Sequence, residues 1–155
     1  MGQIDNRLAE LGLTLPQAAK PIANYVPWVR TGNLVFISGQ GPIADGKITL
    51  QGRLGDSISI EDGIKSARLS AINVIAQLKD ACGGDLDKVV RIVKLVGFVN
   101  ATHDFTDHPK VINGASDLMV EVLGDHGRHT RAAVGCSSLP ANAATEIEAI
   151  LLVAL

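Results

Sequence analysis

Apolar residues recur every three or four positions in two stretches of the chain, a spacing that places them on one face of an α-helix. In the first stretch these residues are Ile60, Ile64, Ala67, Ala71, Val74, Ile75 and Leu78. Ser59 can cap the start of this helix, with Asp62 three residues later, and two glycines follow Cys82. The pattern therefore predicts a helix that begins after Ser59 and ends at Cys82.

The second stretch predicts a helix that begins near Pro109 and ends at Gly124. Proline suits the first turn of a helix, Asp107 or His108 can cap it, and glycine suits the position after a helix end. The expected buried stripe consists of Val111, Ile112, Ala115, Leu118, Met119 and Val122. A third, weaker helix is expected near the N-terminus, where Ile4, Leu8 and Leu11 are apolar.

Other apolar residues gather in short runs typical of strands. Three strands are expected between residues 25 and 51, one over residues 89–99, and two at the C-terminal end, joined by a turn that contains Pro140. The order β-β-β-α-β-α-β-β predicts an α+β fold, a mixed sheet with two helices packed on one face. Residues 1–19 are interpreted as an N-terminal extension with a short helix, and residues 20–155 as a single domain.

Composition adds an expectation about assembly. The chain of 155 residues fits one domain, and 46% of its residues are hydrophobic although only 3% are aromatic and 19% charged. Because obligate subunit interfaces are more apolar than ordinary surface, this aliphatic excess favours a homo-oligomer in which subunit contacts cover the second face of the sheet.

Charge and targeting signals argue against several partners. The net charge is −2 and the basic residues are scattered, so no nucleic-acid surface is expected. No apolar run reaches membrane-spanning length and the N-terminus lacks a signal-peptide profile, so we expect a soluble, cytoplasmic protein with no membrane partner. Cys82 and Cys136 fit the free thiols of such a protein, although their spacing leaves one disulfide possible.

Familiar catalytic motifs are missing. The sequence from Gly41 to Lys47 approaches a phosphate-binding loop, but Ile48 replaces the hydroxyl residue that the motif requires, so a hairpin turn is expected there. No G-x-S-x-G sequence is present. The histidines at 103, 108, 126 and 129 lack a zinc-ligand spacing, so we expect no metal.

The residues with the strongest chemical potential lie near the C-terminus. Arg131 opens one of the last two expected strands and Glu146 opens the other. If these strands pair with each other, a permanent cation and a carboxylate come together in a site that can hold an acid and move a proton. An ion pair on an exposed sheet edge is the alternative interpretation. His129, two residues before Arg131, is expected on the same strand face.

Several short motifs follow one another along the chain: Tyr25, Gly32-Asn-Leu-Val-Phe-Ile-Ser-Gly-Gln40, Phe98-Val-Asn100, Arg131, Leu139-Pro140 and Glu146-Ile-Glu148. Their order resembles the Rid family, the YjgF-type reactive-intermediate deaminases, also called the endoribonuclease L-PSP family. The resemblance covers residues 20–155 and implies a chorismate-mutase-like fold, a homotrimer, and a pocket at each subunit interface. The segments Val111-Ile-Asn-Gly-Ala-Ser116 and His129-Thr-Arg-Ala-Ala-Val-Gly135 resemble a subgroup distinct from the archetypal deaminases.

The resemblance implies hydrolysis of small reactive 2-imino or enamino acids to 2-oxo acids and ammonia, with no cofactor. In that reaction Arg131 would bind the substrate carboxylate and Glu146 would position or activate water. The substrate-binding residues implied or suggested are Tyr25, Ser38, Gly39, Asn113, His129 and Ala133. Position 133 is alanine where many relatives carry cysteine, so a main-chain role would survive there.

Two other functions stay open at this point. A non-catalytic trimer that binds small carboxylates, or an interaction protein, would need Arg131 but not a working Glu146. Endoribonuclease activity is the third alternative, which the acidic charge balance disfavours.

Overall fold

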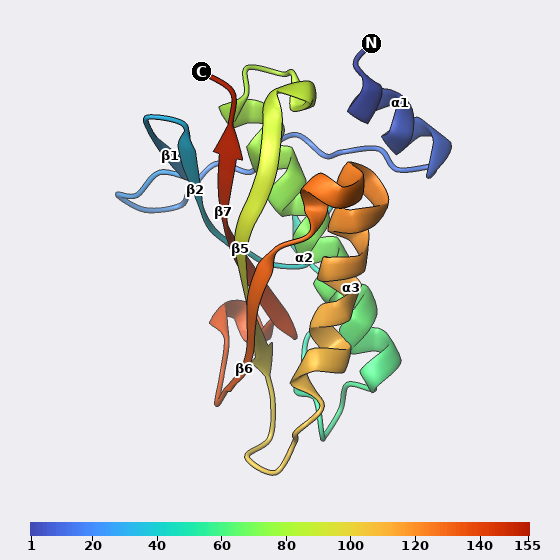
Figure 1. The fold of residues 1–155 in the computed structure, drawn as a ribbon. Helices are drawn as coiled ribbons and strands as arrows, with labels where there is room; N and C mark the ends of the chain where they lie inside the picture. Colours follow the sequence, from blue (N-terminus) through green and yellow to red (C-terminus); the bar gives the residue numbers. More distant parts are fainter.

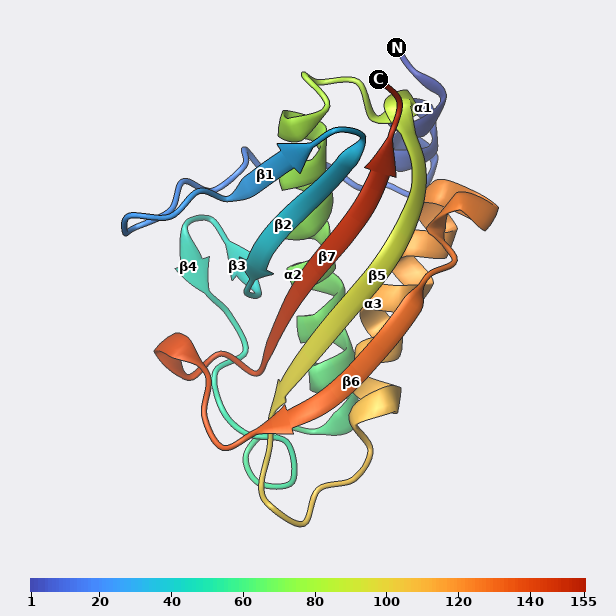
Figure 2. The same cartoon turned by 60° about the vertical axis from the view of Figure 1, so that its left-hand side comes forward.

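The computed structural model describes residues 1–155 as a five-stranded sheet covered by helices on one side. The strands follow the order β1-β2-β7-β5-β6, which Figure 2 shows face-on with the helices behind. Their bounds are Trp28–Thr31 (β1), Leu34–Gln40 (β2), Thr145–Val153 (β7), Val89–Asn100 (β5) and Thr130–Cys136 (β6). Only β5 and β6 are parallel. The predicted α+β fold with a mixed sheet is confirmed.

Helices α2 (Ile60–Ala81) and α3 (His108–Leu123) pack side by side on this one face, as Figure 1 shows from the sheet edge. Both begin and end as predicted. The Ser59 hydroxyl accepts a hydrogen bond from the amide of Asp62, 3.1 Å away, and Gly83 and Gly124 adopt positive φ at the two C-terminal ends. Caps and apolar stripes of this kind are local signals, which is why the sequence located both helices.

The helices approach each other closely at Gly114. A methyl group at this position would overlap the carbonyl oxygen of Ile64 in the facing helix. The core between helices and sheet is aliphatic, with Ile75, Leu95 and Leu118 among its fully buried side chains. The buried hydrophobic residues include no aromatic side chain, in line with the low aromatic content.

The last two strands do not pair with each other, contrary to one expectation. Strand β5 lies between β6 and β7 and pairs with both. The reason is topological: β5, α3 and β6 form a crossover unit that returns the chain parallel to β5 on its outer edge. Strand β7 then crosses to the other side of β5 and runs antiparallel to it.

The segment before α2 contains four strands rather than the expected three. Strands β3 (Ile43–Ala44) and β4 (Lys47–Ile48) form a separate two-stranded sheet. The predicted hairpin turn joins them, with Asp45 and Gly46 at positive φ, as a two-residue hairpin turn requires. The remaining turn signal, at Gly32 and Asn33, joins β1 to β2.

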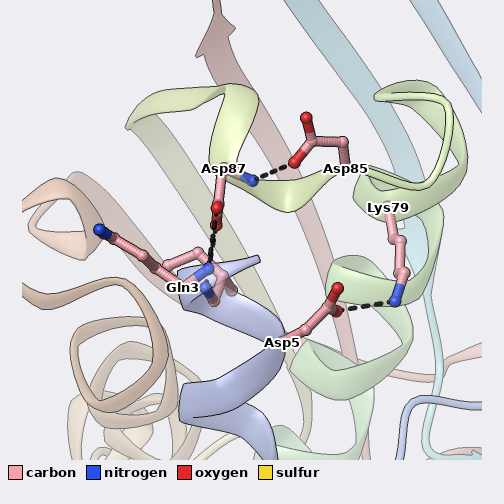
Figure 3. A network of polar contacts seen from close by, with 6 residues as sticks. Gln3, Asp5, Lys79, Asp85 and Asp87 are labelled. Carbon is pink, nitrogen blue, oxygen red and sulfur yellow. Dashed lines mark hydrogen bonds and ion pairs between the residues drawn. The ribbon is translucent and has the colours of Figure 1, made fainter. Parts of the chain in front are cut away.

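An N-terminal helix, α1 (Gln3–Glu10), docks against the end of the main body (Figure 3). The carboxylate of Asp87 accepts hydrogen bonds from the amides of Gln3 and Ile4, at 2.8 and 2.9 Å. These two bonds lower the pKa of Asp87. Lys79 of α2 pairs with Asp5 at 2.8 Å. Asp87 therefore caps α1 from a distant part of the sequence, and no local sequence pattern predicts such a cap.

Two further expectations can be compared with the structure. Cys82 and Cys136 are both free, so the possible disulfide is not formed. None of the helices is both long enough and apolar enough to cross a membrane.

Candidate active site

The sequence-predicted site residues fall into two clusters on opposite faces of the sheet. Arg131 pairs in register with Leu95, whose side chain is buried beneath the helices. Glu146 pairs in register with Phe98, on the face that the helices leave open. Side chains alternate between faces along a strand, so the two register positions separate the charged groups.

The first group, here called the arginine cluster, consists of Arg131, Asn113, Ser116, His129 and Ala133. The Nη1 group of Arg131 donates hydrogen bonds to Asn113 Oδ1 at 2.8 Å and to Ser116 Oγ at 3.2 Å, both on α3. No other nitrogen of this exposed guanidinium is bonded within the chain. Arg131 is therefore held in place by one nitrogen and keeps donors free for an anion.

His129 supports this arrangement through Ser116. Its Nδ1 lies 2.6 Å from the carbonyl oxygen of Gly127, which can only accept, so Nδ1 carries a proton. In the neutral ring Nε2 is then an acceptor, and it receives the hydrogen of Ser116 Oγ at 2.9 Å. The Ser116 oxygen is left to accept from Arg131. A chain of directed hydrogen bonds thus orients the arginine from behind.

Ala133 lies two residues further along β6 and faces the same side as Arg131. Its side chain packs against the hydrophobic core. A thiol at this position is absent, so Ala133 can contribute to a site only through its backbone and its shape.

The second group, the carboxylate cluster, consists of Ser38, Gly39 and Glu146; Tyr25 lies on the segment that leads into β1. The Ser38 hydroxyl donates to the carbonyl oxygen of Val26 at 2.8 Å, which fixes the segment that carries the exposed Tyr25. The Glu146 carboxylate lies against the backbone of Gly39, where any side chain would overlap its Oε1 atom. Glycine at position 39 therefore makes the space that Glu146 occupies.

The environment of Glu146 favours its protonated form. Burial raises the pKa of this carboxyl above its ordinary value, and the neighbouring negative charge of Glu148 raises it further. No hydrogen bond or positive charge offsets these effects. A carboxyl group of this kind can exchange a proton closer to neutral pH than an exposed glutamate does.

This raised pKa predicts a pH-dependent effect of Glu146→Gln on stability. The folded protein holds the proton more tightly than the unfolded chain, so ionisation of Glu146 reduces stability as pH rises from the ordinary value of 4.5 through the raised one. We expect Glu146→Gln to be more stable than the wild type at pH 7, with the difference shrinking toward pH 4, in urea unfolding followed by circular dichroism. Glu61→Gln is the control for an exposed carboxylate: Glu61 lies in the first turn of α2, where its charge favours the helix, so this variant should be slightly less stable than the wild type at pH 7. If Glu146→Gln is less stable than the wild type at pH 7, the raised pKa of Glu146 is contradicted.

Within one chain the two clusters are too far apart to act on one small molecule. Arg131 and Glu146 lie on either side of β5, and their register positions differ by three residues along it. Two strand spacings and three residues of rise separate their backbones by about 14 Å, and their side chains leave opposite faces. The expectation that one chain brings them together by strand pairing is wrong.

Sequence reasoning missed one member of the arginine cluster, Ser116. The signal was present, because Ser116 follows Asn113 by three residues and such pairs share a helix face. The other predicted residues are divided as described, with Asn113, His129 and Ala133 near Arg131, and Ser38 and Gly39 on the strand beside Glu146.

Comparison with known proteins decides the family. The model of the YjgF/chorismate-mutase-like (endoribonuclease) family matches residues 5–152. The chain belongs to the YjgF family. Among its relatives, protein TCP17 of Trypanosoma cruzi is 44% identical over 97% of this chain and 94% of its own length. The 2-iminobutanoate/2-iminopropanoate deaminase of Dermatophagoides farinae is 26% identical, over 91% and 94%.

Solved structures of YjgF proteins agree with this assignment. Atu1372 from Agrobacterium tumefaciens, a protein of unknown function, is 49% identical with a TM-score of 0.91, over 97% of this chain and 92% of its own. TdcF from E. coli, solved with bound serine, is 29% identical with a TM-score of 0.64, over 88% and 93%. The chain is thus closer to Atu1372 than to TdcF within the YjgF family.

Proposed function

We propose that this protein hydrolyses small 2-imino acids to 2-oxo acids and ammonia. The observation that carries the proposal is the state of Arg131, which Asn113 and Ser116 hold through one nitrogen while its other donors stay free. A planar guanidinium in this state suits bidentate capture of a carboxylate. The relative from Dermatophagoides farinae, a deaminase named for such substrates, supports the substrate class.

Glu146 is assigned to the water. Its carboxylate accepts a proton from a water molecule as the oxygen attacks the C=N carbon, and the protonated carboxyl then returns a proton to the nitrogen. The product of this addition is a carbinolamine, which bears OH and NH2 on one carbon. Glu146 then takes the hydroxyl proton and passes it to the nitrogen, so the C–N bond breaks, ammonia leaves, and the carbon becomes the carbonyl of the 2-oxo acid. The raised pKa of Glu146 suits both halves of this exchange, since the group must gain and lose a proton in one cycle.

The proposed site is completed between copies of the chain in a homotrimer. Within one chain the arginine and carboxylate clusters face away from each other, so a substrate that touches both needs a second subunit. The open face of the sheet also favours subunit contacts, because it presents apolar side chains such as Val29, Phe36 and Val134. In such a pocket Tyr25, Gly39 and the backbone of Ala133 would line the substrate.

Imine hydrolysis can be measured directly. We expect the purified protein to speed the loss of 2-iminobutanoate or 2-iminopropanoate, generated in place by an amino-acid oxidase and trapped with semicarbazide. Arg131→Ala should lower kcat/KM at least about a hundredfold, because it removes a charge-assisted bidentate contact. Full activity of Arg131→Ala, or no turnover by the wild type across several imines, would refute the proposal.

Binding of a small carboxylate without turnover is the second candidate function. The structure of TdcF with bound serine, itself a carboxylate, favours it. Under this alternative, affinity survives Glu146→Gln and is lost with Arg131→Ala, and neither the wild type nor any variant speeds ammonia release above the uncatalysed rate. The ammonia measurement therefore separates the two functions, while ligand titration of the same variants tests the shared arginine.

A further inference from the structure

A cavity of about 390 Å³ lies at the carboxyl ends of the parallel strands β5 and β6. Its lining includes Arg53, His103, Phe105, His108, Cys136 and Ser137. Ligands of open α/β sheets commonly bind outside the carboxyl ends of parallel strands, where the crossover helix begins. The start of α3, at His108, occupies that place here, and its helix dipole adds positive potential.

The charges that line this cavity are cationic. Arg53 supplies a permanent positive charge, His103 and His108 supply imidazole nitrogens that can bond to a ligand, and no carboxylate is among the lining residues. Two acidic residues adjacent in sequence to the lining have other partners: Asp104 accepts from Thr102 Oγ1 at 2.7 Å, and Asp107 pairs with Lys110 at 3.3 Å. In a chain whose net charge is −2, this local excess favours an anion.

Arg53 has hydrogen-bond donors that the protein leaves unused. Its Nη2 group donates to the carbonyl oxygen of Ala101 at 3.0 Å, which anchors the side chain, while its Nη1 group makes no hydrogen bond within the chain. The backbone amides of His103 and Ser137, at the exposed rim, also have no acceptor in the chain. A ligand with several acceptor oxygens can therefore bond to the guanidinium and to these amides.

The shape of the cavity is held by contacts around His108. The ring of Phe105 meets the imidazole edge-on at a centroid distance of 5.2 Å, which orients it. Position 135 is glycine, and a side chain there would collide with the Nε2 edge of His108. Phe105 also gives the cavity an apolar wall, and the volume exceeds what a bare inorganic anion needs.

We propose that this cavity binds a small phosphate monoester. A phosphate carries several acceptor oxygens and up to two negative charges, which match the guanidinium, the imidazoles and the free amides. The organic part of the ester would lie against Phe105. The site is separate from the arginine cluster, because Gly135 lies four residues along β6 from Arg131, about 13 Å away.

Titration calorimetry at constant ionic strength tests the proposal with inorganic phosphate and phenyl phosphate as probes. We expect both to bind and phenyl phosphate to bind more tightly. Arg53→Met should weaken both at least about tenfold, since it removes the charged fork. Lys65→Met removes an exposed cation from α2 and should change neither affinity. Equal affinity in wild type and Arg53→Met, or equal binding of acetate, would overturn the proposal.

A second variant covers the case in which Arg53→Met does not fold. Ser137 is exposed at the cavity rim, so Ser137→Asp adds a negative charge without disturbing the Arg53 anchor, and it should abolish phenyl phosphate binding. Cys136 supplies a local reporter, because it lines the cavity whereas Cys82 is buried. Saturating phenyl phosphate should slow alkylation of Cys136 severalfold, and an unchanged rate would contradict the location.

Discussion

Two inactive variants, Arg131→Met and Glu146→Gln, are expected to regain imine hydrolysis when they are mixed in one oligomer. If each site takes Arg131 from one chain and Glu146 from its neighbour, some mixed interfaces carry both intact residues. In the proposed trimer, every assembly that contains both variants has one of its three interfaces in the order that joins an intact Arg131 to an intact Glu146, which restores about a third of wild-type activity. Co-expression of differently tagged chains, followed by tandem purification and the semicarbazide assay, measures this.

The matched control is a mixture of Arg131→Met with Arg131→Ala. Every site in that mixture lacks the arginine, so activity should stay at the level of the separate variants. If the Arg131→Met and Glu146→Gln chains copurify and activity still does not return, the two clusters do not meet across an interface. The result would then remove the proposed site while leaving the family assignment intact.

Gly114→Ala is expected to lower the free energy of unfolding by about 3 kcal/mol, the upper range for overpacking a core. Alanine has the higher helix propensity, which alone would stabilise α3 by about 1 kcal/mol. The added methyl group, however, would overlap the carbonyl oxygen of Ile64, a backbone atom that can move only if the helices separate. Urea unfolding monitored by circular dichroism gives the difference.

Gly63→Ala is the matched control for this effect. Gly63 is also a buried helical glycine, but a methyl group there would meet side-chain carbon atoms of Leu54 and Val111, which can shift. We therefore expect a smaller loss of stability than for Gly114→Ala. Equal losses would mean that the helix–helix approach at Gly114 is not the tight contact that the structure describes.

The sequence identified the elements and residues of the site, but it did not predict how they lie relative to one another. The turn between β1 and β2, the Ser59 cap and the glycine after α3 are local signals, and each appears where it was expected. The pairing of the Arg131 and Glu146 strands was a long-range inference from closeness in sequence, and it failed. Because the chain crosses over through α3, β5 lies between the strands that carry Arg131 and Glu146. No local sequence signal predicts that β5 occupies this position.

The polar contacts divide in the same way. Asn113 and Ser116 share a helix face because of their spacing, so sequence alone could have paired them. The bond from Arg131 to both, the cap that Asp87 provides for α1, and the cavity that Arg53 shares with His108 join residues far apart in the chain. Such contacts depend on which elements become neighbours, and that is settled by packing.

By itself, then, the sequence determined the elements, their ends, the mixed α+β class and the residue types available for chemistry, because caps, glycines and apolar periodicity act over a few residues. Tertiary structure alone decided that Arg131 and Glu146 leave opposite faces of the sheet and that burial raises the pKa of Glu146. The reason is physical: side-chain direction follows from strand register, and a pKa follows from burial, and both are properties of the packed chain.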